Sequence, residues 1–521
     1  MMKRTEKSET TRKKAGRARA RAPVKAVRIH PWDTVAVALE PLAQGRTVTI
    51  GGLKVRCADD IPRGHKLALK DIACDEQVIK YGTPIGKASS AIPAGAHVHT
   101  HNLETLIEDT SNYHWTYPQI APPRYTAAPD IHVFKRRDGR IGIRNEVWIV
   151  PTVGCVNRTA ESLASWANSA FADRNIGGVF AWTHPYGCSQ MGSDHEATCT
   201  ILADLVKHPN AGAVLVLSLG CESNTPELFK DMLGEYAEDT DRVKFLVTQE
   251  SGDEIADGKR LLGKLVAHAE LAKREKAPVS ALVVGMKCGG SDGLSGITAN
   301  ALAGQICDML TDMGASVILT EVPEMFGAEQ MLMDRCETLE IFNKTVRLIN
   351  DFKGYFCLNN QPVYENPSPG NKAGGISTLE DKSCGCVQKG GAALVRGVYR
   401  YGDRLPLSAK GLVLLEGPGN DIVSTTAMTA AGAHLILFTT GRGTPLGAPV
   451  PTIKIASNTP LAQKKPSWID FDAGKLLVEQ ADTLREALFQ LLLDTTNGTV
   501  MTRNELNNYR EIAIFKNGVI L

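Results

Sequence analysis

The sequence lacks any long apolar run, and it carries almost no net charge. No stretch approaches the roughly 20 apolar residues that a membrane-spanning helix needs, and the start of the chain has no apolar run of the kind found in secretory signals. A formal net charge of +1 argues against a role in which the whole protein binds nucleic acid or a membrane surface. We therefore expect a cytoplasmic protein without a membrane partner.

Cysteine pairs with the spacing of a metal site are also missing. The 12 cysteines include no Cys-x-x-Cys pair, and the Cys-x-Cys of Cys384 and Cys386 is nonspecific and too tight for an easy disulfide. This many cysteines in a long chain without a signal indicates reduced thiols rather than a disulfide framework. The spacing of the cysteines therefore gives only a weak signal for a metal.

The length and the pattern of the chain indicate several domains. A chain of 521 residues is too long for a single hydrophobic core. Residues 1–27 are rich in Lys and Arg, and we expect them to form a disordered basic tail. Short β-branched runs separated by Gly and Pro predict a small β-rich domain over residues 28–103. A proline-rich linker is expected at residues 104–129.

Beyond the linker, apolar strand-like runs alternate with helical segments. Each run breaks into a glycine-rich or polar loop, as in "EVWIVPTVGCVN" and "VSALVVGMKCGGSDG". This alternation predicts two α/β domains with largely parallel sheets, at residues 130–272 and 278–521. Ligands of such sheets bind beyond the carboxyl ends of the strands, so the polar loops can converge on one pocket.

Four of these loops carry a cysteine soon after a predicted strand. The four are Cys155, Cys188, Cys221 and Cys288. Thiolates in glycine-rich loops can ligate iron or zinc or act as nucleophiles, and this set could hold an iron–sulfur cluster. The alternative is that they are small thiols that only pack the loops.

Three histidines stand at every second position of "AGAHVHTHN". If this segment is extended, His97, His99 and His101 project from one face of a strand. Such a row of imidazoles can bind a metal or the substrate, or it can have a structural role at a surface.

Other loops carry residues suited to an anionic, oxygen-rich substrate. "KCGGSDGLSG" offers many backbone donors together with Ser291 and Asp292, and "NPSPGNKAGG" places Asn371 and Lys372 in a Gly/Pro-rich loop. Arg442 in "TTGRGTP" suits a substrate carboxylate.

Two further side chains could transfer protons. His184 in "THPYGCSQ" and Glu321 in "TEVPE" could each act as a general base or as a structural hydrogen-bonding group. The residue types indicate a small polar acid as substrate, but they do not determine the reaction.

Long motifs of the chain resemble the altronate/galactarate dehydratase family. "RGHKLALKDIA", "VIKYGTPIGKA" and "HVHTHN" are similar to its N-terminal SAF domain. "YGCSQMGSDH", "CGGSDGLSGITAN", "TEVPEMFGAEQ" and "NPSPGNKAGG" are similar to its two catalytic-region domains. The resemblance covers about residues 28–521, and the triple-histidine string and "EMFGAEQ" look like the altronate branch rather than the galactarate branch.

The resemblance implies dehydration of D-altronate to 2-keto-3-deoxy-D-gluconate in hexuronate (galacturonate) catabolism. The expected cofactor is Fe(II) or another divalent ion such as manganese. A base must remove the proton beside the carboxylate, the enediolate needs electrostatic stabilisation, and an acid must protonate the departing 3-hydroxyl. The enol then becomes the 2-keto product.

The resemblance also suggests a role for each candidate residue. Arg442, Lys372 and Asn371 would contact the sugar acid, and Lys372 could also take part in catalysis. Ser291 and Asp292 would hold its hydroxyls.

His184 or Glu321 would be the base. Either the histidine row or the cysteine set would hold the metal, and the sequence does not choose between them.

Rival functions are galactarate dehydration and a non-catalytic sugar-acid- or nucleic-acid-binding protein. The small-molecule substrate is the main partner we expect, together with a second copy of the chain in a homo-oligomer.

Overall fold

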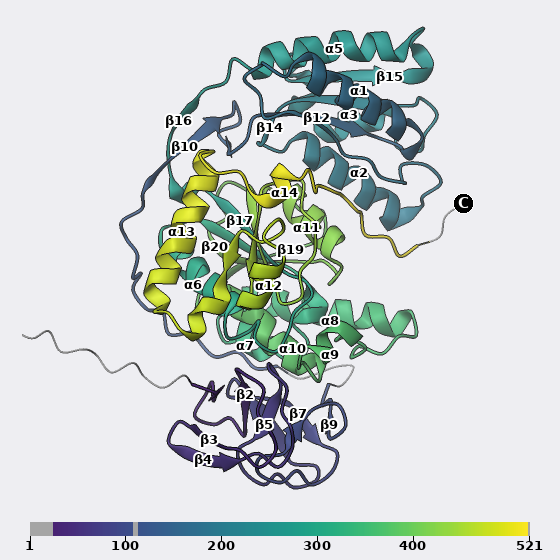
Figure 1. Ribbon diagram of the computed structural model, residues 1–521. Helices are drawn as coiled ribbons and strands as arrows, with labels where there is room; N and C mark the ends of the chain where they lie inside the picture. The colour runs from purple at the N-terminus through teal and green to yellow at the C-terminus, as the bar shows by residue number, and fades with distance from the viewer. Residues whose placement is uncertain (1–23, 108–112, 519–521) are drawn as a thin grey trace, which may run out of the picture.

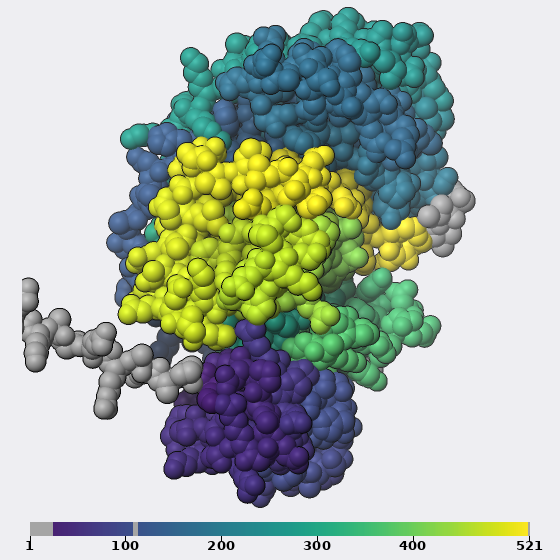
Figure 2. All heavy atoms as spheres, viewed as in Figure 1, coloured from purple at the N-terminus to yellow at the C-terminus, as the bar shows by residue number. Residues whose placement is uncertain are grey.

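The computed structural model describes residues 24–107 and 113–518. The chain folds into a small β domain and two α/β domains, and the C-terminal α/β domain lies between the other two (Figure 1). Figure 2 shows the same order as three successive masses, from the purple β domain to the blue and teal first α/β domain. The predicted fold class is confirmed.

The N-terminal domain consists of three small antiparallel sheets, ordered β1-β2-β5-β8, β3-β4 and β6-β7-β9. Strand β3 buries Val48 and Ile50 and exposes Thr47 and Thr49, the alternation typical of a half-buried strand. The strands are β1 (Ala26–Val27), β2 (Val35–Ala38), β3 (Thr47–Ile50), β4 (Leu53–Arg56), β5 (Lys66–Ala68), β6 (Gln77–Lys80), β7 (Thr83–Ala88), β8 (His97–Val98) and β9 (Leu103–Glu104).

Strand β1 lies inside the segment that the sequence predicts to be a disordered tail. Its residues pair with Ala38 and Val37 of β2, and Ala26 is buried. The predicted tail boundary at residue 27 is therefore wrong, because strand pairing and burial hold Ala26 and Val27 in the first sheet. The rest of that prediction falls on residues 1–23, which lie outside the described residues. Residues 113–129, within the predicted linker, form no helix or strand.

The first α/β domain is a four-stranded parallel sheet in the order β13-β12-β14-β15. All residues of β14 are buried, as expected for a central strand covered by helices on both faces. The elements are β12 (Glu146–Pro151), η1 (Gly154–Val156), α1 (Asn157–Ala170), β13 (Val179–Ala181), α2 (Gly192–Val206), β14 (Ala211–Ser218), α3 (Pro226–Leu233), α4 (Glu235–Glu238), β15 (Val243–Val247), η2 (Thr248–Glu250) and α5 (Glu254–Ala269).

A three-stranded antiparallel sheet joins the two α/β domains. Its strands are β10 (Asp130–Lys135), β11 (Ile141–Gly142) and β16 (Arg274–Pro278). Ile131 and Val133 of β10 pack into the hydrophobic core of the C-terminal domain. The segment that begins the predicted first α/β domain thus packs partly on the other domain.

The C-terminal domain is a seven-stranded parallel sheet in the order β19-β20-β18-β17-β21-β22-β23. The strand order changes direction around β17, and such a switch point is the usual place for a ligand in an open α/β sheet. The strands are β17 (Val283–Cys288), β18 (Ser316–Leu319), β19 (Val395–Tyr399), β20 (Gly411–Leu415), β21 (Leu435–Thr440), β22 (Thr452–Ala456) and β23 (Phe471–Asp472).

Helices cover this sheet, and several short helices sit in its loops. They are α6 (Ala299–Asp312), η3 (Val279–Ala281), η4 (Val322–Glu324), α7 (Glu329–Met333), α8 (Leu339–Leu358), α9 (Pro369–Ala373), α10 (Leu379–Cys386), η5 (Val387–Gly390), α11 (Asp421–Ala430), α12 (Thr459–Lys464), η6 (Ala473–Leu477), α13 (Ala481–Asn497) and α14 (Arg503–Leu506). Within residues 24–107 and 113–518, no helix combines the length and the apolar character needed to cross a membrane.

A buried ionic network fixes the β domain to the C-terminal domain. Lys66 of β5 donates to Asp381 Oδ2 at 2.7 Å, and Lys80 of β6 donates to Asp381 Oδ1 at 2.8 Å. All three side chains are at most 2% exposed. Burial opposes ionisation of Asp381, but Lys66 and Lys80 outweigh it and hold the pKa of this carboxyl below its usual range. Lys66 also donates to Ser377 Oγ at 2.7 Å.

We expect the substitution Asp381→Asn to destabilise the protein strongly. It leaves two buried ammonium groups without a counter-charge, which costs about 3–5 kcal/mol of unfolding free energy. Denaturant unfolding of the purified protein measures this loss. The control is Glu340→Gln, which breaks an exposed ion pair with Lys344 and should leave the midpoint unchanged. Equal midpoints for both variants would contradict the proposed importance of the buried network.

Candidate active site

Three glycine-containing segments meet where the β domain touches the C-terminal domain. They contain Gly64 before β5, Gly293 after β17, and Gly374 and Gly375 after α9. The amide of Gly293 donates to the carbonyl of Gly374 at 2.8 Å. A Cβ on Gly293 would lie 1.9 Å from the carbonyl oxygen of Gly64, and one on Gly375 would lie 2.4 Å from it. The segments can approach this closely only because they lack side chains.

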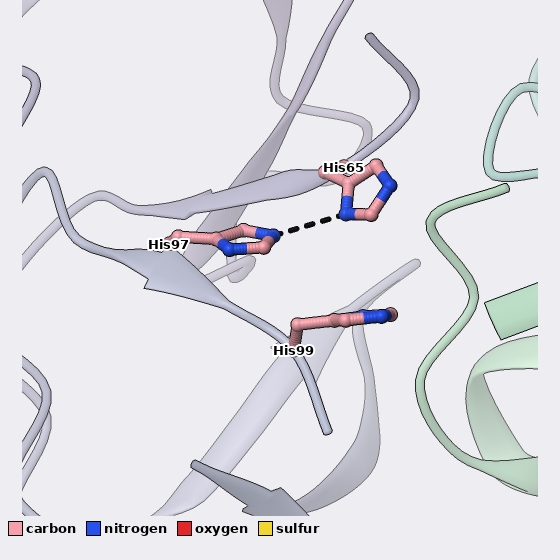
Figure 3. A group of neighbouring side chains, drawn as sticks. All are labelled: His65, His97 and His99. Carbon is pink, nitrogen blue, oxygen red and sulfur yellow. Dashed lines mark hydrogen bonds between the residues drawn. The ribbon is translucent and has the colours of Figure 1, made fainter. Parts of the chain in front are cut away.

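Three histidines of the β domain gather beside this contact (Figure 3). His65 precedes β5, and His97 belongs to β8, which pairs with β5. His65 Nδ1 lies 3.0 Å from His97 Nε2, and the rings of His97 and His99 stack at 5.5 Å. One ligand nitrogen from each of His65, His97 and His99 lies within 4.8 Å of the others. The strand pairing thus assembles a group of imidazoles from two separate segments.

The histidine group differs from the predicted row in one member. The strand includes only His97 and Val98, because the chain turns directly afterwards: His99 accepts a backbone hydrogen bond from Asn102 at 3.0 Å. His101 is exposed beyond this turn and lies outside the group. His65 takes its place. His65 belongs to the motif "RGHKLALKDIA", which the family resemblance already singled out. The motif alone does not show that the strand following His65 pairs with the strand of His97.

The environment of the histidines favours neutral imidazole. Burial lowers the pKa of His97 to about 4, with the charges of His65 and His101 adding to the effect. Burial and the nearby Lys66 lower the pKa of His99 to about 3, and burial also lowers the pKa of His65. Neutral imidazole nitrogen is the form that ligates Fe(II), Mn(II) or Zn(II). The donor set therefore fits a divalent transition metal.

Two of the three histidines, His65 and His99, also contact the C-terminal domain. His99 Nδ1 lies 2.9 Å from Ser377 Oγ, and His65 Nε2 lies 3.4 Å from the carbonyl of Ala373. Hydrogen bonds of this kind orient metal-ligating histidines. The histidine group therefore depends on both domains.

A second group of potential ligands lies at the carboxyl ends of β17 and β18. Glu324 Oε2 accepts from the thiols of Cys288 at 3.3 Å and Cys386 at 3.2 Å, and the two sulfurs are 3.3 Å apart. Their ligand atoms lie within 4.8 Å of one another. Lys389 donates to Cys288 Sγ at 2.7 Å, and Lys382 donates to Glu324 Oε1 at 2.8 Å. All of these side chains are buried.

Lysines already neutralise this second group. Burial opposes ionisation of Glu324, but Lys382, Lys287 and Lys389 outweigh it and lower its pKa to about 2. The predicted base Glu321 belongs to the same network, bound by Lys287 and, at 2.9 Å, by Lys389. Lys389 on Cys288 Sγ and Lys382 on Glu324 Oε1 thus compete with a metal for two of the donor groups, so the histidine group is the better candidate for a metal.

Glu321 carries a further sign of a functional position. Its backbone lies in the left-handed region, with φ of 70° and ψ of 52°. A non-glycine residue in this region is strained, and such strain concentrates at sites where the surroundings impose a geometry. Here the strain presents the carboxylate to Lys287 and Lys389.

The predicted substrate-contacting residues come together. Asn371 Nδ2 donates to the carbonyl of Ser291 at 2.8 Å, and Arg442 Nη1 donates to the carbonyl of Gly370 at 3.3 Å. Asp292 accepts from Ser457 Oγ at 2.8 Å and from Asn458 Nδ2 at 3.1 Å, so it ties two loops together.

Lys372 is half-buried and directly precedes Ala373, whose carbonyl faces His65. Arg442 is exposed at the edge of the same group of loops.

His184 lies elsewhere, in the first α/β domain. Its Nε2 bonds the carbonyl of Pro151 at 2.8 Å, and its Nδ1 accepts from the amide of Tyr186 at 3.2 Å. Burial lowers its pKa. Both ring nitrogens are therefore engaged with the backbone of their own domain, and His184 connects two strand-end loops.

The four predicted cysteine ligands do not form one set. Cys288 is buried at the end of β17 in the C-terminal domain, whereas Cys155, Cys188 and Cys221 are exposed in the first α/β domain. The prediction of a site made from all four is wrong, because the strands that carry them belong to two different sheets. Cys386 and Lys389, which do contact Cys288, were missed because they come from α10 and η5.

The protein is a mixed α/β protein whose candidate site lies between its β domain and its C-terminal domain. Three family models match the chain: the altronate/galactarate dehydratase SAF domain at residues 24–106, the second domain of D-galactarate dehydratase/altronate hydrolase at 133–270, and the C-terminal domain of D-galactarate/altronate dehydratase at 279–520. The chain belongs to the altronate/galactarate dehydratase family, which confirms the resemblance in its motifs.

Named relatives match nearly the whole chain. Altronate dehydratase of Escherichia coli (strain K12) is 49% identical and that of Bacillus subtilis (strain 168) is 48% identical, each over 95% of this chain and 99% of the relative. Galactarate dehydratase (L-threo-forming) of E. coli is 30% identical over 94% of this chain and 96% of its own length.

Proposed function

We propose that the protein is a hydro-lyase that converts D-altronate into 2-keto-3-deoxy-D-gluconate, in the cytoplasm and in hexuronate catabolism. The observation that carries this proposal is the group of neutral histidines facing the glycine-rich loops of Ser291 and Asn371. The higher identity to altronate dehydratases, 48–49% against 30%, favours altronate over galactarate.

The reaction removes a proton from the carbon beside the carboxylate and a hydroxyl from the next carbon. The resulting enol becomes the 2-keto acid, and water leaves. A divalent ion on His65, His97 and His99, iron or manganese, would supply Lewis-acid stabilisation of the enediolate oxygens. This charge stabilisation is the main catalytic demand, because a proton beside a carboxylate is only weakly acidic.

The loops of the C-terminal domain bind and orient the sugar acid. Arg442 lies at the rim and pairs with the carboxylate, for which its planar guanidinium is suited. The backbone around Ser291, which Asn371 holds in place through its side-chain amide, binds the hydroxyls. The short helix α9 is fixed by its capping box, in which Ser368 and Asn371 bond each other's backbone amides. The capping box fixes the backbone that carries Lys372 and Ala373, and the carbonyl of Ala373 contacts His65.

Lys372 is our candidate for the general base. Lys372 directly precedes Ala373, whose carbonyl contacts His65. The polar atoms of His184 and Glu321 are instead bonded within other hydrogen-bond networks. A lysine can act as a base when a desolvated position or a nearby cation favours its neutral amine. The same group, once protonated, can return the proton to the leaving hydroxyl.

A substrate comparison tests the proposed activity. We expect purified protein supplied with Fe(II) or Mn(II) to form a 2-keto acid from D-altronate, with kcat/KM at least about tenfold above that for galactarate, a difference of about 1.4 kcal/mol. A preference for galactarate would instead establish the rival substrate. Binding of either acid without turnover would establish a non-catalytic protein.

The metal site is tested with histidine variants. We expect the double substitution His97→Ala/His99→Ala to weaken Mn(II) binding by at least about 100-fold, because two of three imidazole ligands are lost. Titration of the metal-free protein measures this loss. The matched control His101→Ala removes a neighbouring exposed imidazole and should bind Mn(II) like the unaltered protein. If His101→Ala weakens binding as much, the group proposed here is wrong.

The base is tested with Lys372→Met. We expect turnover of D-altronate to fall by about 100-fold or more, the usual contribution of a positioned base. Exchange of the substrate proton beside the carboxylate with deuterated solvent should fall equally, while altronate binding persists. Lys464→Met, which removes an exposed lysine of α12, is the control. Undiminished exchange in Lys372→Met would assign proton removal to another group.

A further inference from the structure

Three exposed cysteines follow three adjacent strands of the first α/β domain. Cys155 follows β12, Cys188 follows β13 and Cys221 follows β14, and these strands are neighbours in the order β13-β12-β14. All three strands are parallel, so their carboxyl ends meet at one edge of the sheet. The three thiols therefore belong to one loop cluster, which the histidine site does not use.

Close backbone contacts hold these loops together. The amide of Gly154 donates to the carbonyl of Tyr186 at 2.8 Å, and the amide of Asn224 donates to the carbonyl of Gly187 at 3.2 Å. Gly187 has a φ of 100°, and a Cβ there would lie 2.0 Å from the carbonyl oxygen of Thr152. Cys155 and Cys188 directly follow Gly154 and Gly187. The contacts thus bring the chain segments of all three cysteines together.

The buried carboxylate of Glu222 stabilises the loop that carries Cys221. It accepts from Thr152 Oγ1 at 2.7 Å and from the amide of Leu219 at 3.1 Å. Glu222 directly follows Cys221 and is 3% exposed. The side chain next to Cys221 therefore shapes its loop, whereas the three thiols themselves are exposed.

The ends of two helices favour negative charge in this place. Helix α1 begins at Asn157 and helix α2 at Gly192, shortly after Cys155 and Cys188. Neither helix has a side-chain cap at its N-terminus. The positive end of a helix dipole favours negative charge near the first turn of the helix.

The arrangement excludes two simpler roles. Exposed thiols contribute little to loop packing, for which small buried cysteines are used. A single tetrahedral ion needs ligand sulfurs about 3.8 Å apart, as follows from Zn–S bonds of about 2.3 Å. Among the described residues, the groups whose ligand atoms lie within 4.8 Å of one another include none of these three cysteines. An iron–sulfur cluster tolerates wider spacing, because iron and sulfide lie between the ligand sulfurs.

We propose that Cys155, Cys188 and Cys221 bind an iron–sulfur cluster through three thiolates. Three protein ligands leave one iron of a four-iron cluster open to water or to an oxygen of a small molecule. The site lies in a different domain from the histidine group and is independent of the proposed reaction there.

Anaerobic reconstitution of the full chain tests this proposal. The metal-free protein is incubated with Fe(II), Fe(III) and sulfide, and bound iron and acid-labile sulfide are measured. We expect the unaltered protein to bind sulfide together with more iron than sulfide, because the histidine group can hold iron as well, and Cys155→Ser/Cys188→Ser/Cys221→Ser to bind no sulfide. Sulfide is the decisive quantity, because a histidine site can bind iron but not sulfide. The variants His97→Ala/His99→Ala and Cys288→Ser should keep their sulfide.

Protection from alkylation gives a second measurement without any substitution. Iodoacetamide should label Cys155, Cys188 and Cys221 in the metal-free protein but not after reconstitution. The exposed Cys74 and Cys357 should be labelled in both states. No sulfide in the reconstituted protein, zinc binding without sulfide, or unchanged labelling of the three cysteines would each overturn the proposal.

Discussion

The arrangement of the candidate site depends on one buried carboxylate that pairs with two lysines of another domain. Asp381 at the start of α10 binds Lys66 of β5 and Lys80 of β6, and water is excluded from all three side chains. Buried charges are costly unless they are paired, so the two domains have few alternative ways to meet. His65 is the residue before Lys66. The ion network therefore also determines where the first histidine lies against the C-terminal domain.

Glycines allow the close contact between the two domains that the ion network also stabilises. Lys66 brings β5 toward the loop of residues 373–377, and the close approach of Gly64, Gly293 and Gly375 allows the backbones to touch. A Cβ on Gly293 or Gly375 would lie 1.9 or 2.4 Å from the carbonyl oxygen of Gly64, so a side chain there would force the loops apart. The histidines come from the β domain, and the loops proposed to bind the substrate come from the C-terminal domain. Each domain alone thus carries an incomplete site.

The sequence could predict the parts of the site that lie within single motifs. Alternating apolar runs and loops predicted both parallel sheets. The family resemblance assigned Ser291, Asn371 and Arg442 to the substrate, and their loops are joined by hydrogen bonds, whereas their roles stay a prediction. The histidine row was partly right, because spacing alone cannot show where a strand ends. His65, Cys386 and Lys389 were missed because their roles arise from pairing between segments that are distant in the chain. Cys288 was placed with the wrong partners for the same reason.

The two parallel sheets differ in the groups found at the carboxyl ends of their strands. At the ends of β17 and β18, buried lysines supply the positive charge that balances Glu321, Glu324 and the thiol of Cys288. At the ends of β12, β13 and β14 the three thiols are exposed, and helices α1 and α2 begin nearby without side-chain caps. In the first arrangement protein cations balance the buried carboxylates without a ligand. The second leaves its sulfur atoms accessible, so a cationic partner can reach them from solution.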